Sequence, residues 1–298
     1  MEKGDILYCQ KEIKQPMMQW NLVLKLTQDI ADQASLSGVK AQNLVFLGGI
    51  AIYLHSRKAL GDKVVNRWRG THDIDLVVTE KGGAGKILSG IQKSHNYEYI
   101  EPLRSHFPDK QTWEIKSQGK GYLNDKERTI DIDVYLTNSA TGYTNLNGRQ
   151  IGAYPDKFIS QPVETITTGA KYKTAEVAVP SLLDCLIMKL DVAATDGKLR
   201  NKDRSDILCL LMINEKQGGD GQQFINQAID KISGSKKIKP VLAEMESLFT
   251  NILNCYRKRK IDPEMTGFIP SEKCLKRCKE TTQNIQEILI GTIDRTTN

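Results

Sequence analysis

The sequence predicts an α+β fold, in which an N-terminal mixed β-sheet flanked by helices is followed by a mainly α-helical C-terminal domain. Two observations carry this prediction. Before Pro180, apolar runs of strand length alternate with segments of helical periodicity, whereas after it the periodicity is helical throughout. The length of 298 residues also favours two domains over one. We expect the boundary to divide the chain into residues 1–170 and residues 171–298.

The first part of the chain is predicted to mix helices and strands. Apolar residues recur at helical spacing in segments separated by glycine turns and charged loops. The helices are expected over residues 20–34, 50–60 and 86–93. Short β-branched and apolar runs predict strands over residues 43–47, 73–79, 97–103, 112–116 and 129–136.

The second part of the chain is predicted to be helical. Glycine and proline interrupt its periodic segments, and Ser181 with Asp184 is close to a capping-box start. The helices are expected over residues 181–194, 202–214, 222–232, 240–256 and 271–292.

Composition and charge exclude several classes of protein. Hydrophobic residues make up 39% of the chain and charged residues 26%, which is too balanced for a collagen-like or disordered chain. The formal charge of +6 is compatible with a polyanionic partner but common among enzymes. Six widely spread cysteines favour reduced thiols, and we see no signal peptide or membrane-spanning run. We expect a cytoplasmic protein without a membrane partner.

Two acidic pairs are the strongest candidates for chemistry. Asp73 and Asp75 alternate on one predicted strand, so their side chains share a face, about 7 Å apart along it. Asp131 and Asp133 repeat the pattern on another strand. Paired carboxylates repel unless a cation neutralises them, so the pattern favours a hard divalent ion, Mg²⁺ with Mn²⁺ as the alternative.

A glycine pair adds a second feature. Gly48 and Gly49 lie at a predicted strand-to-helix turn, where backbone N–H groups can approach phosphate at the positive end of a helix. A strand, a Gly-Gly turn, a helix, an Asp-x-Asp strand and a later acidic strand follow one another in this order. The order is far less common by chance than any one of these signals.

In this order the chain resembles the nucleotidyltransferase superfamily that includes DNA polymerase beta. The segments that carry the resemblance read LGGIAIYL, RGTHDIDLVV and RTIDIDVYL. Within the superfamily the chain is most similar to the AbiEii/AbiGii toxin family, whose Arg-x-Thr-x-Asp-Ile-Asp motif corresponds to residues 69–75. A Lys-bearing helix and a later basic and acidic segment extend the resemblance over about residues 44–212.

The resemblance implies transfer of a nucleoside monophosphate from an NTP to an acceptor, on a nucleotidyltransferase-type sheet that a helical domain closes over. Asp73 and Asp75 would hold the metal, and Asp131 would complete the site, with Asp133 as the alternative one register step away. The catalytic residues would then be Asp73, Asp75, Asp131 and Asp133. The residues implied in nucleotide binding are Gly48, Gly49, Arg69, Thr71, Lys189, Arg200, Lys202, Asp203 and Asp206.

The resemblance further implies a toxin of a toxin–antitoxin or phage-defence pair, which acts on tRNA, another RNA or a protein and has a cognate antitoxin. Two alternatives stay open. One is a small-molecule nucleotidyltransferase of the aminoglycoside type, since a fold does not fix the acceptor. The other is a non-catalytic nucleotide-binding or RNA-binding homologue. For residues 202–206, a solvated helix face with i,i+3 and i,i+4 charge pairs is a further alternative.

Overall fold

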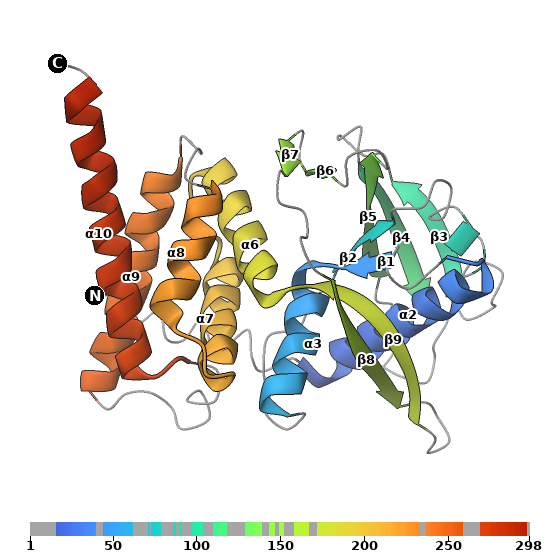
Figure 1. Ribbon diagram of the computed structural model, residues 1–298. Coiled ribbons are helices and arrows are strands. Elements are labelled where there is room, and N and C mark those ends of the chain that lie inside the picture. The colour runs from blue at the N-terminus through green and yellow to red at the C-terminus, as the bar shows by residue number, and fades with distance from the viewer. Residues whose placement is uncertain are drawn as a thin grey trace. The chain divides into compact units, whose positions relative to one another are not determined.

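The chain consists of two compact units, which the computed structural model in Figure 1 shows. The first comprises Met1–Leu54 and Asn66–Ser181, and the second comprises His55–Val65 and Leu182–Asn298. The first unit thus continues beyond the predicted boundary at residue 170 and includes one more strand. The structure describes residues 16–39, 44–61, 71, 73–78, 86–87, 90, 97–103, 110–117, 129–138, 143–146, 149–151, 158–166, 172–232, 237–258 and 269–296.

A mixed sheet forms the first unit. Its strands in the described part of the chain are β1 (Leu44–Phe46), β2 (Asp73–Val78), β3 (Tyr97–Leu103), β4 (Lys110–Ser117), β5 (Thr129–Asn138), β6 (Tyr143–Leu146), β7 (Arg149–Ile151), β8 (Phe158–Ile166) and β9 (Tyr172–Pro180). The strand order is β3-β4-β5-β2-β1-β9-β8, and β6 and β7 extend from β5. β2 pairs with β5 and β1 with β9 in parallel, while the other neighbours are antiparallel.

The core of the first unit lies at the centre of this sheet. Val45 on β1, Ile74 on β2 and Ile132 on β5 are fully buried. Helix α2 (Pro16–Leu36) packs against β8, β9 and β2. Its buried residues Val23, Leu26 and Ile30 recur at helical spacing, which places them on one face.

Five helices form most of the second unit. They are α6 (Leu182–Asp196), α7 (Asn201–Lys216), α8 (Gly221–Ile232), α9 (Ile238–Arg257) and α10 (Glu272–Thr296). α6 packs against α7, α8 and α9, and α10 packs against α8 and α9. The hydroxyl of Ser271 accepts a hydrogen bond from the Cys274 N–H, which caps the start of α10. All five helices predicted for this region are confirmed, with ends that differ by a few residues.

Helix α3 (Gly48–Leu60) is a single helix whose first turns belong to the first unit and whose last residues belong to the second. In the second unit, Ser56 of α3 lies 3.2 Å from Cys209 of α7, between the Oγ and Sγ atoms, and both residues are fully buried. α3 begins directly after β1, so its first residues are positioned by the sheet.

Four strands were not predicted, namely β6, β7, β8 and β9. The helix expected over residues 86–93 lies largely outside the described residues, although residues 86, 87 and 90 are helical. In the part of the chain that the structure describes, every helix is too short or too polar to cross a membrane.

Candidate functional site

The two acidic pairs lie directly opposite one another in the sheet of the first unit. β2 and β5 are parallel neighbours, and their register pairs Asp73 with Asp131 and Asp75 with Asp133. Adjacent strands lie about 4.8 Å apart, so each acidic pair is within the reach of one shared ligand. The two strands that carry the acidic pairs are therefore direct neighbours in the sheet.

Alternation along each strand separates the acids from the core. Ile74 and Ile132 are fully buried on one face of the sheet. Asp73, Asp75 and Asp133 are half-buried, and strand alternation places them on the other face. The side chain of Asp131 lies outside the described residues, although its place in the register is fixed.

The glycine pair lies beside the acids of β2. The Leu47 N–H donates to the Asp75 carbonyl oxygen at 2.8 Å, so the turn after β1 remains attached to β2. Gly48 has a φ of +55°, and a Cβ there would collide with the Asp75 carboxylate. A Cβ at Gly49 would be 2.9 Å from both Cβ and Oγ1 of Thr71. A side chain at either position would therefore collide with Asp75 or Thr71.

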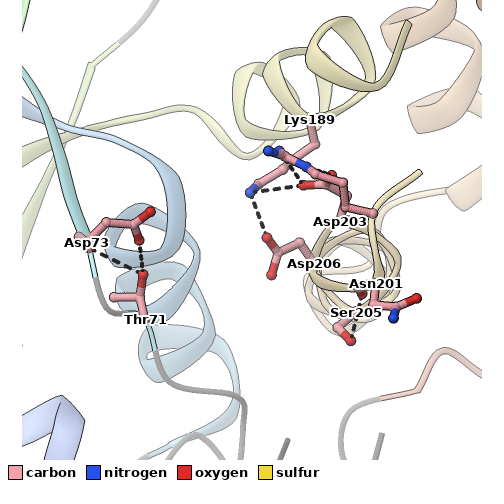
Figure 2. Close-up of polar contacts among 8 residues, drawn as sticks. Thr71, Asp73, Lys189, Asn201, Asp203, Ser205 and Asp206 are labelled. Carbon is pink, nitrogen blue, oxygen red and sulfur yellow. Dashed lines mark hydrogen bonds and ion pairs between the residues drawn. The ribbon is translucent and has the colours of Figure 1, made fainter. Parts of the chain in front are cut away.

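Thr71 makes a direct contact with the first acid (Figure 2). Its hydroxyl donates to Asp73 Oδ1 at 2.5 Å and also lies 3.2 Å from the Asp73 carbonyl oxygen. The residue is 4% exposed. One orientation of the Asp73 carboxylate is thereby favoured.

The start of α3 adds a favourable electrostatic environment. The first-turn N–H groups of a helix carry partial positive charge, and Gly48 and Gly49 occupy this turn. The first turn of α3 carries no acidic side chain of its own. The carboxylate of Asp75 beside it is therefore stabilised by the helix dipole, and the same turn would attract phosphate oxygens.

A second charged cluster lies within the second unit, between α6 and α7. Lys189 Nζ is 2.7 Å from Asp206 Oδ2 and 3.5 Å from Asp203 Oδ1. Arg200 donates to both oxygens of Asp203, from Nε at 2.6 Å and from a terminal nitrogen at 3.1 Å. Figure 2 shows Lys189 reaching both aspartates. We call these four residues the α6–α7 ion network.

Burial distinguishes this network from a surface charge cluster. The carboxylates of Asp203 and Asp206 are fully buried and Lys189 is 14% exposed, whereas Arg200 is 38% exposed. The hydrogen bond to Asp203 raises the pKa of Arg200, so its charge is fixed. The alternative of a solvated helix face is wrong for Asp203 and Asp206, because both point into the helical core.

Arg204 of α7 is paired at the edge of the same region. Its guanidinium lies 2.9 Å from Glu244 Oε2 on α9, and this oxygen also accepts from the Leu199 N–H at 3.1 Å. Glu244 was not predicted as a site residue, since it lies 40 positions from Arg204 and no local pattern links them. The contacts of Glu244 with Arg204 and with the Leu199 N–H stabilise the segment that connects α6 to α7.

The structure therefore gathers the predicted residues in two groups, one in each unit. Those of the first unit are Gly48, Gly49, Thr71, Asp73, Asp75, Asp131 and Asp133. Those of the second unit are Lys189, Arg200, Asp203 and Asp206. Lys202 is half-buried in the first turn of α7, and Arg69 lies outside the described residues.

The residues of β2 fit a hard divalent cation by their chemistry. Carboxylate oxygens are the ligands that Mg²⁺ prefers, and the absent Cβ of Gly48 leaves the Asp75 carboxylate its space. Among the described residues, no group of three or more His, Cys, Asp or Glu side chains gathers closely enough to hold a metal. The side chain of Asp131, the predicted third ligand, is not among the described residues.

Comparisons with known proteins found two similar solved chains, both from Helicobacter pylori. One is a "putative nucleotidyltransferase", 15% identical, with a TM-score of 0.45 over 92% of this chain and 98% of that one. The other is JHP933, 14% identical, with a TM-score of 0.42 over 100% of this chain and 98% of that one. No protein-family model and no curated protein matches. Likenesses this distant leave the interpretation of the site to the chain's own residues.

Proposed function

We propose that this chain is a metal-dependent nucleotidyltransferase, which transfers a nucleoside monophosphate from an NTP to an acceptor and releases pyrophosphate. The observation that carries the proposal is the parallel register of β2 and β5, which pairs Asp73 with Asp131 and Asp75 with Asp133. The Gly48–Gly49 turn beside β2 supplies the second requirement, a place where backbone can approach phosphate closely.

The acids of β2 and β5 are proposed to have different roles in this site. Asp73 and Asp75 would hold Mg²⁺, or Mn²⁺ in its place, and Asp131 would complete the site, with Asp133 as the alternative. The ion, when bound, offsets the charge of the triphosphate and of the leaving pyrophosphate. A carboxylate of β5 would accept the proton of the attacking hydroxyl, since β5 faces the metal-binding acids across one strand spacing.

The glycine turn would bind the phosphates. Gly48 and Gly49 place backbone N–H groups in the first turn of α3, where the helix dipole favours anions. A larger residue at either position would push against Asp75 or Thr71 before it could contact a nucleotide. The pair would therefore serve both the metal-binding acids and the phosphates. Arg69, two residues before Thr71 in the sequence, is proposed as a further nucleotide-binding residue.

The second unit is proposed to contribute cations that bind phosphate. Arg200 is the more accessible base of the α6–α7 ion network, and its planar guanidinium suits a phosphate group. Asp203 and Asp206 would hold Arg200 and Lys189 in place. Lys202 in the first turn of α7 is proposed as an additional phosphate contact.

For the acceptor we propose an RNA such as tRNA, or a protein, with the chain acting as the toxin of a toxin–antitoxin or phage-defence pair. This part rests on the resemblance of residues 44–212 to the AbiEii/AbiGii family. The small positive net charge agrees with a polyanionic acceptor.

The experiment incubates the full chain with Mg²⁺, each of four NTPs labelled at the α-phosphorus, and total RNA. Label on RNA that disappears with Asp73→Ala supports the proposal and identifies the base and the acceptor. Label on the chain itself instead points to self-modification or to a protein acceptor. Absence of label on either, from a chain that binds NTP by calorimetry, contradicts RNA and protein transfer. A parallel reaction with aminoglycosides then tests a small-molecule acceptor.

A further inference from the structure

We propose that Thr71 is a positioning residue, which fixes the Asp73 carboxylate in the orientation that binds the metal. The resemblance to known sequences implies only a nucleotide-binding role for this residue. The contacts of its side chain point to the acid instead. In this role Thr71 serves the metal site of the proposed function, on which the assignment rests.

The first step is the direction of the hydrogen bond. A threonine hydroxyl has one proton, and Thr71 Oγ1 lies within reach of two acceptors, Asp73 Oδ1 and the Asp73 carbonyl oxygen. The carboxylate oxygen is nearer and charged, so it takes the proton in the stronger bond. The bond occupies one lone pair of Oδ1 and so favours one orientation of the whole carboxylate group.

The second step is the confinement of the hydroxyl. Thr71 is 4% exposed, so its side chain is shielded from a solvent-side ligand. Gly49 lies against it, because an added Cβ would be 2.9 Å from Thr71 Oγ1 and 3.5 Å from its Cγ2. The backbone at the start of α3 thus packs closely against Thr71, and Thr71 in turn contacts Asp73.

The contacts of Gly49 with Thr71, and of Thr71 with Asp73, are expected to affect metal affinity. A carboxylate that is free to rotate must lose that freedom when it binds a cation, whereas a carboxylate already held by a neighbour does not. Removal of such an outer partner lowers metal affinity or activity by about 10- to 100-fold in known sites. We expect loss of the Thr71 hydroxyl to lower metal affinity by a factor of this size, although Thr71 does not contact the nucleotide.

The test measures Mn²⁺ binding by the full chain with electron paramagnetic resonance, which detects the free ion. Thr71→Val keeps the shape of the side chain and removes the hydroxyl, and Thr71→Ser keeps the hydroxyl. The matched control is Thr27→Val in the same unit, because Thr27 is also buried and its hydroxyl donates to the Val23 carbonyl oxygen at 2.7 Å. Asp73→Ala removes a proposed metal ligand and so tests whether the measured Mn²⁺ binding occurs at this site.

Thr71→Val is expected to bind Mn²⁺ about 10- to 100-fold more weakly. Thr71→Ser and Thr27→Val are expected to keep the affinity of the unmodified chain. In transfer assays, Thr71→Val should need more Mn²⁺ for half-maximal rate and recover most of its kcat at saturating metal. A general structural defect would lower kcat at every metal concentration.

The outcomes distinguish the positioning role of Thr71 from the existence of the metal site. Unchanged Mn²⁺ affinity in Thr71→Val, together with its loss in Asp73→Ala, overturns the role of Thr71 and leaves the proposed function standing. Unchanged affinity in Asp73→Ala, or no Mn²⁺ binding by the unmodified chain, overturns the metal site itself. If Thr71→Val does not fold, Thr71→Ala provides the same comparison with Thr71→Ser.

Discussion

Lys189 and Asp206 form an ion pair of 2.7 Å between α6 and α7, and the Asp206 carboxylate is fully buried. Asp203, equally buried, receives Lys189 at 3.5 Å and a two-point contact from Arg200. A buried carboxylate without a nearby cation is strongly disfavoured, so this network ties the two helices together. It also keeps Arg200 oriented, with its guanidinium partly accessible.

Lys189→Met is predicted to destabilise the chain by about 3–5 kcal/mol, since it leaves buried aspartates without their amine partner. Denaturant unfolding measures the change. The matched control is Lys276→Met, because Lys276 pairs with Glu272 at 2.9 Å while both side chains are largely exposed. That variant should lose less than about 1 kcal/mol. Equal losses in the two variants would contradict the role of burial.

Gly48→Ala is predicted to reduce stability and to displace the Asp75 carboxylate. A positive φ costs a non-glycine residue about 1–2 kcal/mol, and the new Cβ would also collide with Asp75. Gly218→Ala is the control, because Gly218 has a φ of +80° and nothing within 4 Å of an added Cβ. Both variants should lose stability, but only Gly48→Ala should lose transfer activity, by about 100-fold. Full activity in Gly48→Ala would show that transfer does not require a glycine at this position.

The stability of the chain is predicted to fall in alkaline solution through Cys185. Burial, assisted by the charge of Asp184, raises the pKa of the Cys185 thiol. The folded state therefore keeps the proton while the unfolded thiol ionises above about pH 8.5, so this contribution is complete below that pH and is lost above it. The difference in unfolding free energy between the unmodified chain and Cys185→Ala should shrink by about 1.4 kcal/mol per pH unit there. A difference that is constant from pH 8 to pH 10 would contradict the prediction.

The helices and central strands of this fold could be predicted because their apolar residues recur with a single spacing, either helical or alternating. Val23, Leu26 and Ile30 mark a helix by spacing alone, and Ile74 between two acids marks a half-buried strand. The local sequence does not predict β8 and β9, although the two strands pair over their full length, from Phe158 opposite Pro180 to Ile166 opposite Tyr172. Proline, glutamate and lysine interrupt their pattern, so long-range pairing rather than local propensity determines these strands.

The candidate site was predictable where its residues are adjacent in sequence. Asp73 and Asp75, with Gly48 and Gly49, could be selected from motif spacing, and the register of β5 could not. The contacts of Lys189 with Asp203 and Asp206 depend on how α6 packs against α7, which the sequence does not reveal. The contact from Thr71 to Asp73 was hidden for another reason, since a threonine two residues before an aspartate is common and does not indicate a hydrogen bond.

Neutralisation of the β2 acids is predicted to abolish turnover without unfolding the chain. Asp73→Asn and Asp75→Asn keep the size of the side chains and remove the charge that would hold the proposed metal. Asp230→Asn on α8 is the control, because Asp230 is exposed and lies in the second unit. Thermal melting should show all three variants folded, and only the control should transfer nucleotide. Turnover by Asp73→Asn and Asp75→Asn would contradict the assignment of the motif.

The most direct test of nucleotidyl transfer by the β2 and β5 acids is a paired reaction with one NTP labelled either at its α-phosphorus or at its γ-phosphorus. Transfer of a nucleoside monophosphate places the α label on the acceptor and the γ label in pyrophosphate, in equal amounts, and Asp73→Asn loses both. We predict this result for the unmodified chain. Appearance of the γ label on the acceptor, or equal transfer by Asp73→Asn, would contradict the central claim.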